Sequence, residues 1–332
     1  ISISGVLSNT EAWDAADKLA AKATTDRVII TYGRDTNDGI PFRWSNINAL
    51  TNTVAKDALN INPITLATDG LGSDRVDFLR GGTGGASASS FRTDRVGKLG
   101  DIVHSAPSYV GVPAAGYSDS IMPGYTAFRD LYKNRQPVIY VGANDGMLHA
   151  FDPASGMEEG QELLAYIPRA VFPNLNKLTG QGYGTNALPH QYFVDATPTA
   201  ADADVNGWKT ILAGGLGAGG QGIYALDITN PSTSTFAESN AANLVLWEFT
   251  DEDDADLGFT FTDPANSAAT GQSRQIARMA NGEWAVIIGN GYNNTEADGH
   301  ASTTGNAYLY ILFIEKGLDG TWTPNSDYIK ID

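Results

Sequence analysis

The sequence has 332 residues, of which 21 are basic and 38 acidic, giving a formal net charge of −17, and it contains no cysteine. Such a charge repels phosphate backbones and anionic lipid surfaces, which argues against nucleic-acid binding. The lack of cysteine excludes disulfides, thiol catalysis and cysteine-based zinc sites. Because 42% of the residues are hydrophobic and no apolar run approaches 18 residues, we expect a globular protein without direct membrane insertion.

The two ends of the sequence predict a longer parent protein. The chain begins at Ile1 with neither an initiator methionine nor the pattern of a signal peptide. It stops at Asp332, on an alternating run that is typical of a strand. We therefore interpret the sequence as a fragment.

Residues 1–95 are predicted to form a small α/β lead-in segment packed on the rest of the chain. Residues 10–23 carry apolar side chains at helical spacing, and Thr10 is the predicted N-cap. The other expected elements are a strand over 26–32 and short helices over 48–59 and 73–81.

Residues 96–332 show short strands and glycine turns, and one layout occurs three times. Each copy has an extended piece with a proline, an apolar strand that ends in glycine, a glycine turn and a second strand. The marker prolines are Pro107, Pro198 and Pro264. Recurring β units of this kind are typical of a β-propeller.

The number of blades follows from the length of this region. Further strands are predicted over 162–168 and 244–251, between the three copies. At about 40–50 residues for each blade, the roughly 230 residues after position 100 predict four to five blades. A closed ring then needs further blades, so we expect the C-terminal blades to be missing from this chain.

The stretch "PVIYVGANDGMLHAFDPASG", residues 137–156, carries the main functional alternative. Asn144, Asp145 and Gly146 predict a hairpin turn, because these residue types tolerate positive φ. The stretch also resembles the repeat of pyrroloquinoline-quinone (PQQ) dehydrogenases, which implies a quinone cofactor beside a metal. The absence of cysteine and the scattered positions of the six tryptophans argue against that enzyme.

Other catalytic patterns give little support to an enzyme. The four histidines, His104, His149, His190 and His300, lack metal-binding spacing, and the hydrolase pattern G-x-S-x-G is absent. The run "GGLGAGGQG" has dinucleotide-type glycine spacing but leads into a strand instead of a helix. We interpret it as a wide hairpin turn.

The best metal candidate is the run "ADADVNGWKT", residues 201–210. Asp202, Asp204 and Asn206 match the first, third and fifth positions of a calcium loop, and glycine follows at the sixth. Ala213 stands where that loop needs a bidentate glutamate. The alternative is a polar turn between two strands. A second acidic run, 251–258, is either a solvated loop or a cation site.

Several longer stretches resemble one family in the family's own order, over nearly the whole chain from about residue 26. They include "SDRVDFLRGG", "LGDIVHSAPSYVG", "PVIYVGANDGMLHAFD", "HQYFVDATPT", "TILAGGLGAGGQGIYALDIT" and "WAVIIGNGYNN". These phrases are similar to the C-terminal domain of the PilC/PilY proteins of type IV pili.

The resemblance implies a mainly β fold, a modified seven-bladed β-propeller of quinoprotein-like type. It further implies an exported bacterial protein at the pilus tip or outer cell surface. The implied partners are minor pilins and a host or abiotic surface. The family's calcium loop is expected after Asp332, and Gly82 stands where an Arg-Gly-Asp motif would need aspartate.

The resulting hypothesis is a non-enzymatic pilus assembly factor and tip adhesin that supports pilus extension and retraction, twitching motility and attachment. Ca²⁺ is the expected cofactor, and PQQ is not expected. The alternative function is a PQQ-dependent quinoprotein dehydrogenase.

Overall fold

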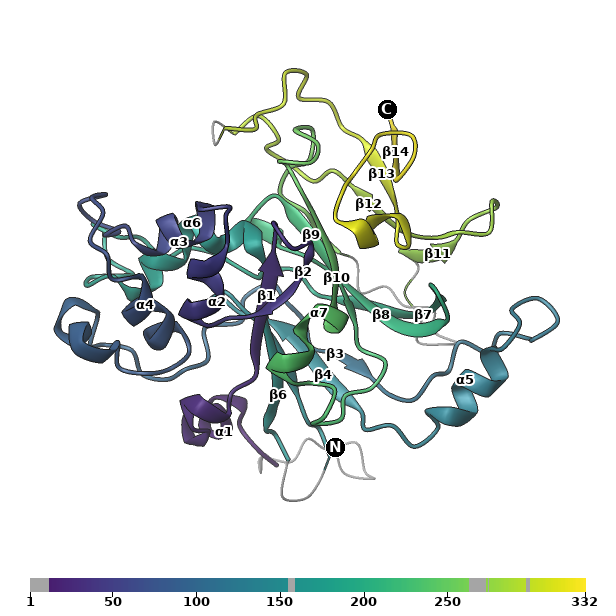
Figure 1. Cartoon of the computed structure of the whole chain (residues 1–332), viewed down its shortest axis with the longest axis horizontal. Coiled ribbons are helices and arrows are strands. Elements are labelled where there is room, and N and C mark those ends of the chain that lie inside the picture. The colour runs from purple at the N-terminus through teal and green to yellow at the C-terminus, as the bar shows by residue number, and fades with distance from the viewer. Residues whose placement is uncertain (1–11, 155–158, 263–272, 274, 297–298) are drawn as a thin grey trace, which may run out of the picture.

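The computed structural model describes residues 12–154, 159–262, 273, 275–296 and 299–332. The strands of these residues form three sheets that follow one another from the lower centre to the upper right of Figure 1. Helices from the first 95 residues gather at the left of the same view. In the described residues, no helix is both long enough and apolar enough to cross a membrane.

The first sheet combines one antiparallel meander with two strands of the lead-in segment. The meander consists of β3 (Ser108–Val110), β4 (Val138–Gly142), β5 (Leu148–Phe151) and β6 (Glu162–Ile167). The lead-in adds β1 (Ile29–Gly33), parallel to β6, and β2 (Asp38–Pro41), antiparallel to β1. Residues before position 95 therefore complete the outer edge of this sheet.

The second and third sheets are plain four-stranded antiparallel meanders. The second contains β7 (Thr199–Asp204), β8 (Trp208–Gly215), β9 (Gly222–Asp227) and β10 (Val245–Thr250). The third contains β11 (Ile276–Arg278), β12 (Trp284–Gly289), β13 (Leu309–Phe313) and β14 (Tyr328–Ile331). Such four-stranded units are the blades of propellers.

Each of the three repeats found in the sequence corresponds to one sheet, but the prediction of four to five blades is wrong for the described residues. The strand connections are much longer than hairpins: 111–137, 168–198 and 290–308. These connections use residues that the length estimate assigned to strands. Pro264 lies outside the described residues.

The helices are short and mostly belong to the lead-in segment. They are α1 (Ala15–Ala21), α2 (Trp44–Ala49), α3 (Val54–Leu59), α4 (Gly72–Leu79), α5 (Tyr125–Leu131), α6 (Phe172–Leu175) and α7 (Ala241–Leu244). Short 3-10 turns lie at Thr24–Asp26, Gly85–Ser90, Arg169–Val171, Asn176–Thr179, Gly217–Gly219, Glu238–Asn240 and Lys316–Asp319.

Three predicted elements formed with altered bounds. The first helix has Asp14 as its N-cap, which accepts hydrogen bonds from two backbone amides, whereas Thr10 lies outside the described residues. The helix expected over 48–59 is divided between the end of α2 and α3, because the carboxylate of Asp35 binds the backbone amides of Thr51 and Asn52 between them. The strand predicted over 26–32 forms three residues later, as β1.

The segment that enters the next blade passes directly against the glycine at the end of a strand, which explains why glycine recurs at that position. A Cβ atom at Gly142, the end of β4, would overlap the carbonyl oxygen of Val194. At Gly215, the end of β8, a Cβ would lie 2.8 Å from the carbonyl oxygen of Thr260. Val194 and Thr260 each lie four residues before a marker proline. The repeated glycine is therefore the point where the next extended piece passes.

Candidate functional site

The segment 137–156 forms the predicted hairpin of β4 and β5, as far as the described residues reach, and it contains a buried ion cluster. His149 on β5 has Nε2 3.1 Å from Asp145 in the turn and Nδ1 2.8 Å from Glu162 on β6. Two nitrogens of Arg27 each lie 2.8 Å from the same Glu162 carboxylate. Arg27 belongs to the lead-in segment, so the cluster joins that segment to the first blade.

The charges of this cluster stabilise one another. Burial lowers the pKa of His149, but the nearby carboxylates of Asp145 and Glu162 outweigh burial and raise that pKa to about 9. Burial raises the pKa of Glu162, but Arg27 and His149 hold it well below its usual range. His149 is therefore protonated at neutral pH, which suits a structural ion pair better than a general base.

The calcium candidate residues lie on the hairpin of β7 and β8. Asp202 is buried in β7, where its carboxylate accepts hydrogen bonds of 2.7 Å from the hydroxyls of Tyr125 and Thr210. Asp204 is exposed at the end of β7, and Asn206 sits in the turn with a positive φ of 51°. The three residues are thus close in sequence on a strand and its turn. In the described residues, no group of three histidine or acidic side chains is placed to hold a metal ion.

Four of the five carboxylates in the acidic run 251–258 form ion pairs with basic residues from distant parts of the chain. Glu252 pairs with Arg169 at 2.6 Å, and Asp253 pairs with Arg34 at 2.6 Å. Lys330 on β14 contacts both Asp254 at 3.0 Å and Asp256 at 2.7 Å. The sequence left open that a bound cation relieves the repulsion among these carboxylates. In the structure, basic side chains of the protein contact them instead.

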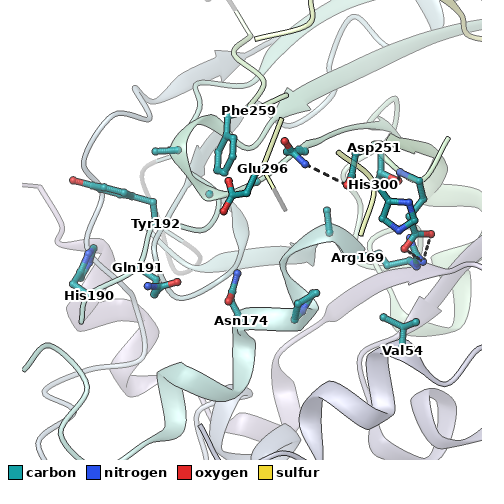
Figure 2. A pocket seen from close by; sticks show the side chains of 18 residues that line it. Val54, Arg169, Asn174, His190, Gln191, Tyr192, Asp251, Phe259, Glu296 and His300 are labelled. Carbon is teal, nitrogen blue, oxygen red and sulfur yellow. Dashed lines mark hydrogen bonds and ion pairs between the residues drawn. The ribbon is translucent and has the colours of Figure 1, made fainter. Parts of the chain in front are cut away.

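A cavity of about 600 Å³ opens where the connections between the blades meet. It is lined by the connection from β6 to β7, the turn between β8 and β9, the residues after β10, and the connection from β12 to β13. Figure 2 shows Asn174 pointing into this space, between Tyr192 on one side and Arg169 on the other. The predicted turn "GGLGAGGQG" forms the wall between β8 and β9, with Gly217–Gly219 as a 3-10 turn.

The cavity continues into a row of four rings, which we call the ring row: His104, Tyr192, His190 and Tyr183. Successive ring centroids are 5.5, 5.5 and 6.0 Å apart. A carboxylate oxygen of Asp195 lies 2.6 Å from Nδ1 of His104, and a carboxylate oxygen of Asp101 lies 3.1 Å from Nε2 of His190. The histidines that the sequence left without a role are therefore oriented by carboxylates on this surface.

Sequence reasoning missed both the cavity and the ring row. The lining comes from segments up to about 250 residues apart, from Val54 to His300. The only local signal was "HQYFVD", residues 190–195, which contains two members of the ring row, His190 and Tyr192. The lining combines aromatic rings, amides and ion pairs, which suits reversible binding of a polar ligand.

Comparison with known proteins agrees with this architecture. The family model described as the PilY1 beta-propeller domain matches residues 99–323. The type IV pilus biogenesis factor PilY1 of Pseudomonas aeruginosa strain UCBPP-PA14 is 40% identical over 316 residues, which cover 93% of this chain and 24% of that protein. A PilY1 homolog of Xylella fastidiosa is 41% identical over 229 residues, which cover 67% of this chain and 16% of the relative.

One solved structure is also similar. The crystal structure of the Pseudomonas aeruginosa PilY1 C-terminal domain has 35% sequence identity and a TM-score of 0.42, covering 63% of this chain and 35% of that one. The present chain spans no more than about a quarter of the length of the two curated relatives described above. Because the family model covers about two thirds of the chain, the chain belongs to the PilY1 β-propeller family of type IV pilus biogenesis factors.

Proposed function

We propose that the chain is the propeller portion of a non-enzymatic type IV pilus assembly factor. In this proposal the whole protein acts at the pilus tip, outside the cell, together with minor pilins. There it supports pilus extension and retraction, twitching motility and attachment to surfaces or host cells. The observation that carries the proposal is the match of the propeller family over residues 99–323, with relatives that are named pilus biogenesis factors.

The alternative, a PQQ-dependent dehydrogenase, has less support. The relatives above are pilus biogenesis factors, and Asp145 and His149 in the segment that resembles the quinoprotein repeat are engaged in a buried ion cluster. Reconstitution with PQQ and calcium, followed by a dye-linked alcohol or sugar oxidation assay, separates the two functions. Reproducible turnover would favour the dehydrogenase.

Two structural expectations belong to the same proposal. We propose that the three blades are part of one seven-bladed ring in the longer protein. Calcium binding at Asp202, Asp204 and Asn206 also stays a prediction. Calorimetric titration of Ca²⁺ into the wild type and into Asp204→Ala tests it, because Asp204 is exposed and its replacement leaves the buried contacts of Asp202 in place. Identical isotherms would remove this site.

The pilus proposal is tested in the source bacterium with the full-length gene. We expect deletion to reduce surface pili, twitching and attachment, and expression of the intact gene to restore all three. A protein lacking residues 99–323 should not restore them. If deletion leaves piliation, twitching and attachment unchanged, the proposal is wrong.

A further inference from the structure

We propose that the cavity and the adjoining ring row bind a neutral carbohydrate chain. The inference names the class of ligand to which the protein would attach, and in that sense it rests on the proposed function. Its physical basis is independent of pilus assembly, since it depends only on the size, ring geometry and charge of one surface.

The first argument is size and position. Sites that take small organic ligands occupy about 300–1,000 Å³, and this cavity has about 600 Å³. It lies among the connecting loops of the blades, where propellers and other rigid scaffolds carry binding residues. A volume of this size admits more than one sugar ring.

The second argument is the ring row. A pyranose has an apolar face of C–H groups, which packs against the flat face of an aromatic ring. Tyr192 is 38% exposed and lies between His190 and His104, with ring centroids 5.5 Å from each. Tyr183 extends the row beyond His190, and the guanidinium of Arg92 lies 5.0 Å over the ring of Tyr183. Neighbouring rings are inclined to one another by 45–80°, and Arg92 covers one face of Tyr183, so the exposed ring of Tyr192 is the main platform for a sugar unit.

Three of the four rings, those of His104, His190 and Tyr183, are held in place before a ligand arrives. Asp195, whose side chain is 1% exposed, contacts Nδ1 of His104 at 2.6 Å and also accepts the backbone amide of that residue. The hydroxyl of Tyr183 accepts a hydrogen bond of 3.0 Å from the backbone amide of Gln191. Pre-organised rings lose little conformational entropy on binding, which raises affinity for a weakly interacting ligand.

The third argument is the polar lining. Asn174 makes no side-chain hydrogen bond within the described residues, and its amide faces the cavity in Figure 2. An amide can donate to one sugar hydroxyl and accept from another. Across the cavity, one guanidinium nitrogen of Arg169 lies 2.6 and 2.7 Å from the two carboxylate oxygens of Glu252, and a guanidinium has further N–H groups that can donate to sugar hydroxyls.

The charge of the lining selects among carbohydrates. The cavity and the ring row together carry five carboxylates and three basic groups: Asp101, Asp195, Asp251, Glu252 and Glu296, against Arg92, Arg169 and Lys177. A sulfated, sialylated or phosphorylated ligand would meet this excess of negative charge and be repelled. The occupant that fits the rings, the amide and the charge is therefore a neutral glycan.

The test uses the purified 332-residue chain and defined probes. Neutral pentasaccharides with β-1,4 and α-1,4 linkages, among them cellopentaose, chitopentaose and maltopentaose, are titrated by saturation-transfer NMR and calorimetry. Sialyllactose and a heparin oligosaccharide serve as anionic probes. We expect binding of at least one neutral pentasaccharide and at least tenfold weaker binding of both anionic probes.

Variants connect any binding to the surface. Tyr192→Ala and Asn174→Ala should each weaken neutral-glycan binding at least fivefold, with unchanged thermal unfolding. Tyr109→Ala is the matched control, because Tyr109 is a 64% exposed tyrosine on β3 outside the cavity lining, and it should bind like the wild type.

The outcomes separate this inference from the pilus proposal. Failure of every neutral probe, equal binding of anionic probes, or unchanged binding by Tyr192→Ala overturns the glycan site. If Tyr192→Ala instead abolishes binding of a purified minor pilin while no glycan binds, the cavity is a protein interface and the inference is wrong. In the bacterium, Tyr192→Ala should reduce attachment and leave surface piliation intact, whereas loss of piliation by deletion tests the pilus role alone.

Discussion

Glu248 on β10 is a buried carboxyl group that forms no ion pair within the described residues, although the charge of Arg169 acts to lower its pKa. Its Oε1 accepts hydrogen bonds from the Tyr166 hydroxyl and, at 2.8 Å, from the backbone amide of Arg169. Its Oε2 has no hydrogen-bond partner within the described residues. Burial outweighs these hydrogen bonds and raises the pKa of Glu248 to about 7. The group thus titrates near neutral pH inside the contact between the first two blades.

We predict that Glu248→Gln stabilises the protein at alkaline pH. The pKa of Glu248 is higher in the folded protein than in the unfolded chain, so its protonated form stabilises the fold. This contribution is complete below about pH 4.5 and is lost as pH rises through about 7. The variant, which cannot ionise, should exceed the wild type in free energy of unfolding by about 1–3 kcal/mol at pH 8 and match it at about pH 4. Urea denaturation at both pH values measures this. A difference that does not change with pH would contradict it.

Arg27 shows the opposite arrangement, a buried charge with full compensation. We predict that Arg27→Met lowers the free energy of unfolding by about 3–5 kcal/mol, because Glu162 and Asp145 would then share only His149. Arg129→Met removes an ion pair with Asp130 in which both side chains are about half exposed, and should change stability by less than about 0.5 kcal/mol. Equal effects of the two variants would show that the cluster is not a structural tie.

His149 adds a pH dependence to the same cluster. Its pKa is raised to about 9, so its contribution is complete below the unfolded pKa of about 6.5 and is lost as pH rises to about 9. The wild type should therefore lose stability between pH 6.5 and 9 in chemical denaturation. The variant Glu248→Gln should still lose the stability that depends on His149 over this pH range. Comparing it with the wild type therefore separates the contribution of His149 from that of Glu248.

At the scale of elements, the glycine at the end of each second strand has a specific steric role. Gly142 and Gly215 face the backbone of the segment that enters the next blade, whereas Gly289, the equivalent residue of β12, has no atom within 4 Å of a Cβ placed on it. The same sequence position is therefore crowded in two blades and open in the third.

This difference gives a matched series of alanine variants. Gly142→Ala and Gly215→Ala should each lower the free energy of unfolding by about 1–3 kcal/mol through overpacking, with the larger effect at Gly142. Gly289→Ala should stay within about 0.5 kcal/mol of the wild type. Thermal and urea unfolding of the three variants provides the comparison. A loss at Gly289 as large as at Gly142 would mean that the effect is not steric.

The elements also show which features can be predicted from sequence. The hairpins, the repeated units and the strands at 162–168 and 244–251 depend on local spacing, on turn residues and on glycine, and the structure has them close to their predicted places. The helix expected over 48–59 is interrupted because Asp35, from another turn, binds two backbone amides in its middle. Local patterns cannot show a partner that tertiary folding supplies.

At the scale of the whole molecule, contacts between distant segments determine the ion-pair partners that could not be predicted from the sequence. Arg27 and Glu162 are 135 residues apart, and Arg34 and Asp253 are 219 residues apart. No spacing rule joins such pairs, so an acidic run and a lone buried histidine gave no sign of their partners. The cavity is similarly assembled from connections of three blades and could not be recognised before the blades were placed.

The acidic run 251–258 links the three sheets, and Lys330 is its contact with the last strand. Lys330 lies between Asp254 and Asp256 and over the ring of Tyr308, at 4.8 Å from the ring centroid. Its side chain is 28% exposed, so solvent screens part of the attraction. Removing this charge leaves two partly buried carboxylates to repel each other and loosens the third sheet from the second.

We predict that Lys330→Met lowers the free energy of unfolding by about 1 kcal/mol at low salt. Because added salt screens charge interactions, the difference from the wild type should shrink as ionic strength rises from about 0.01 to 1 M. Lys316→Met is the control, since Lys316 is 47% exposed and its nitrogen lies 3.8 Å from Glu283. Hydrogen exchange should locate the loss in β13 and β14. Uniform loosening of all three sheets would instead show that Lys330 acts on the molecule as a whole and not as a local tie.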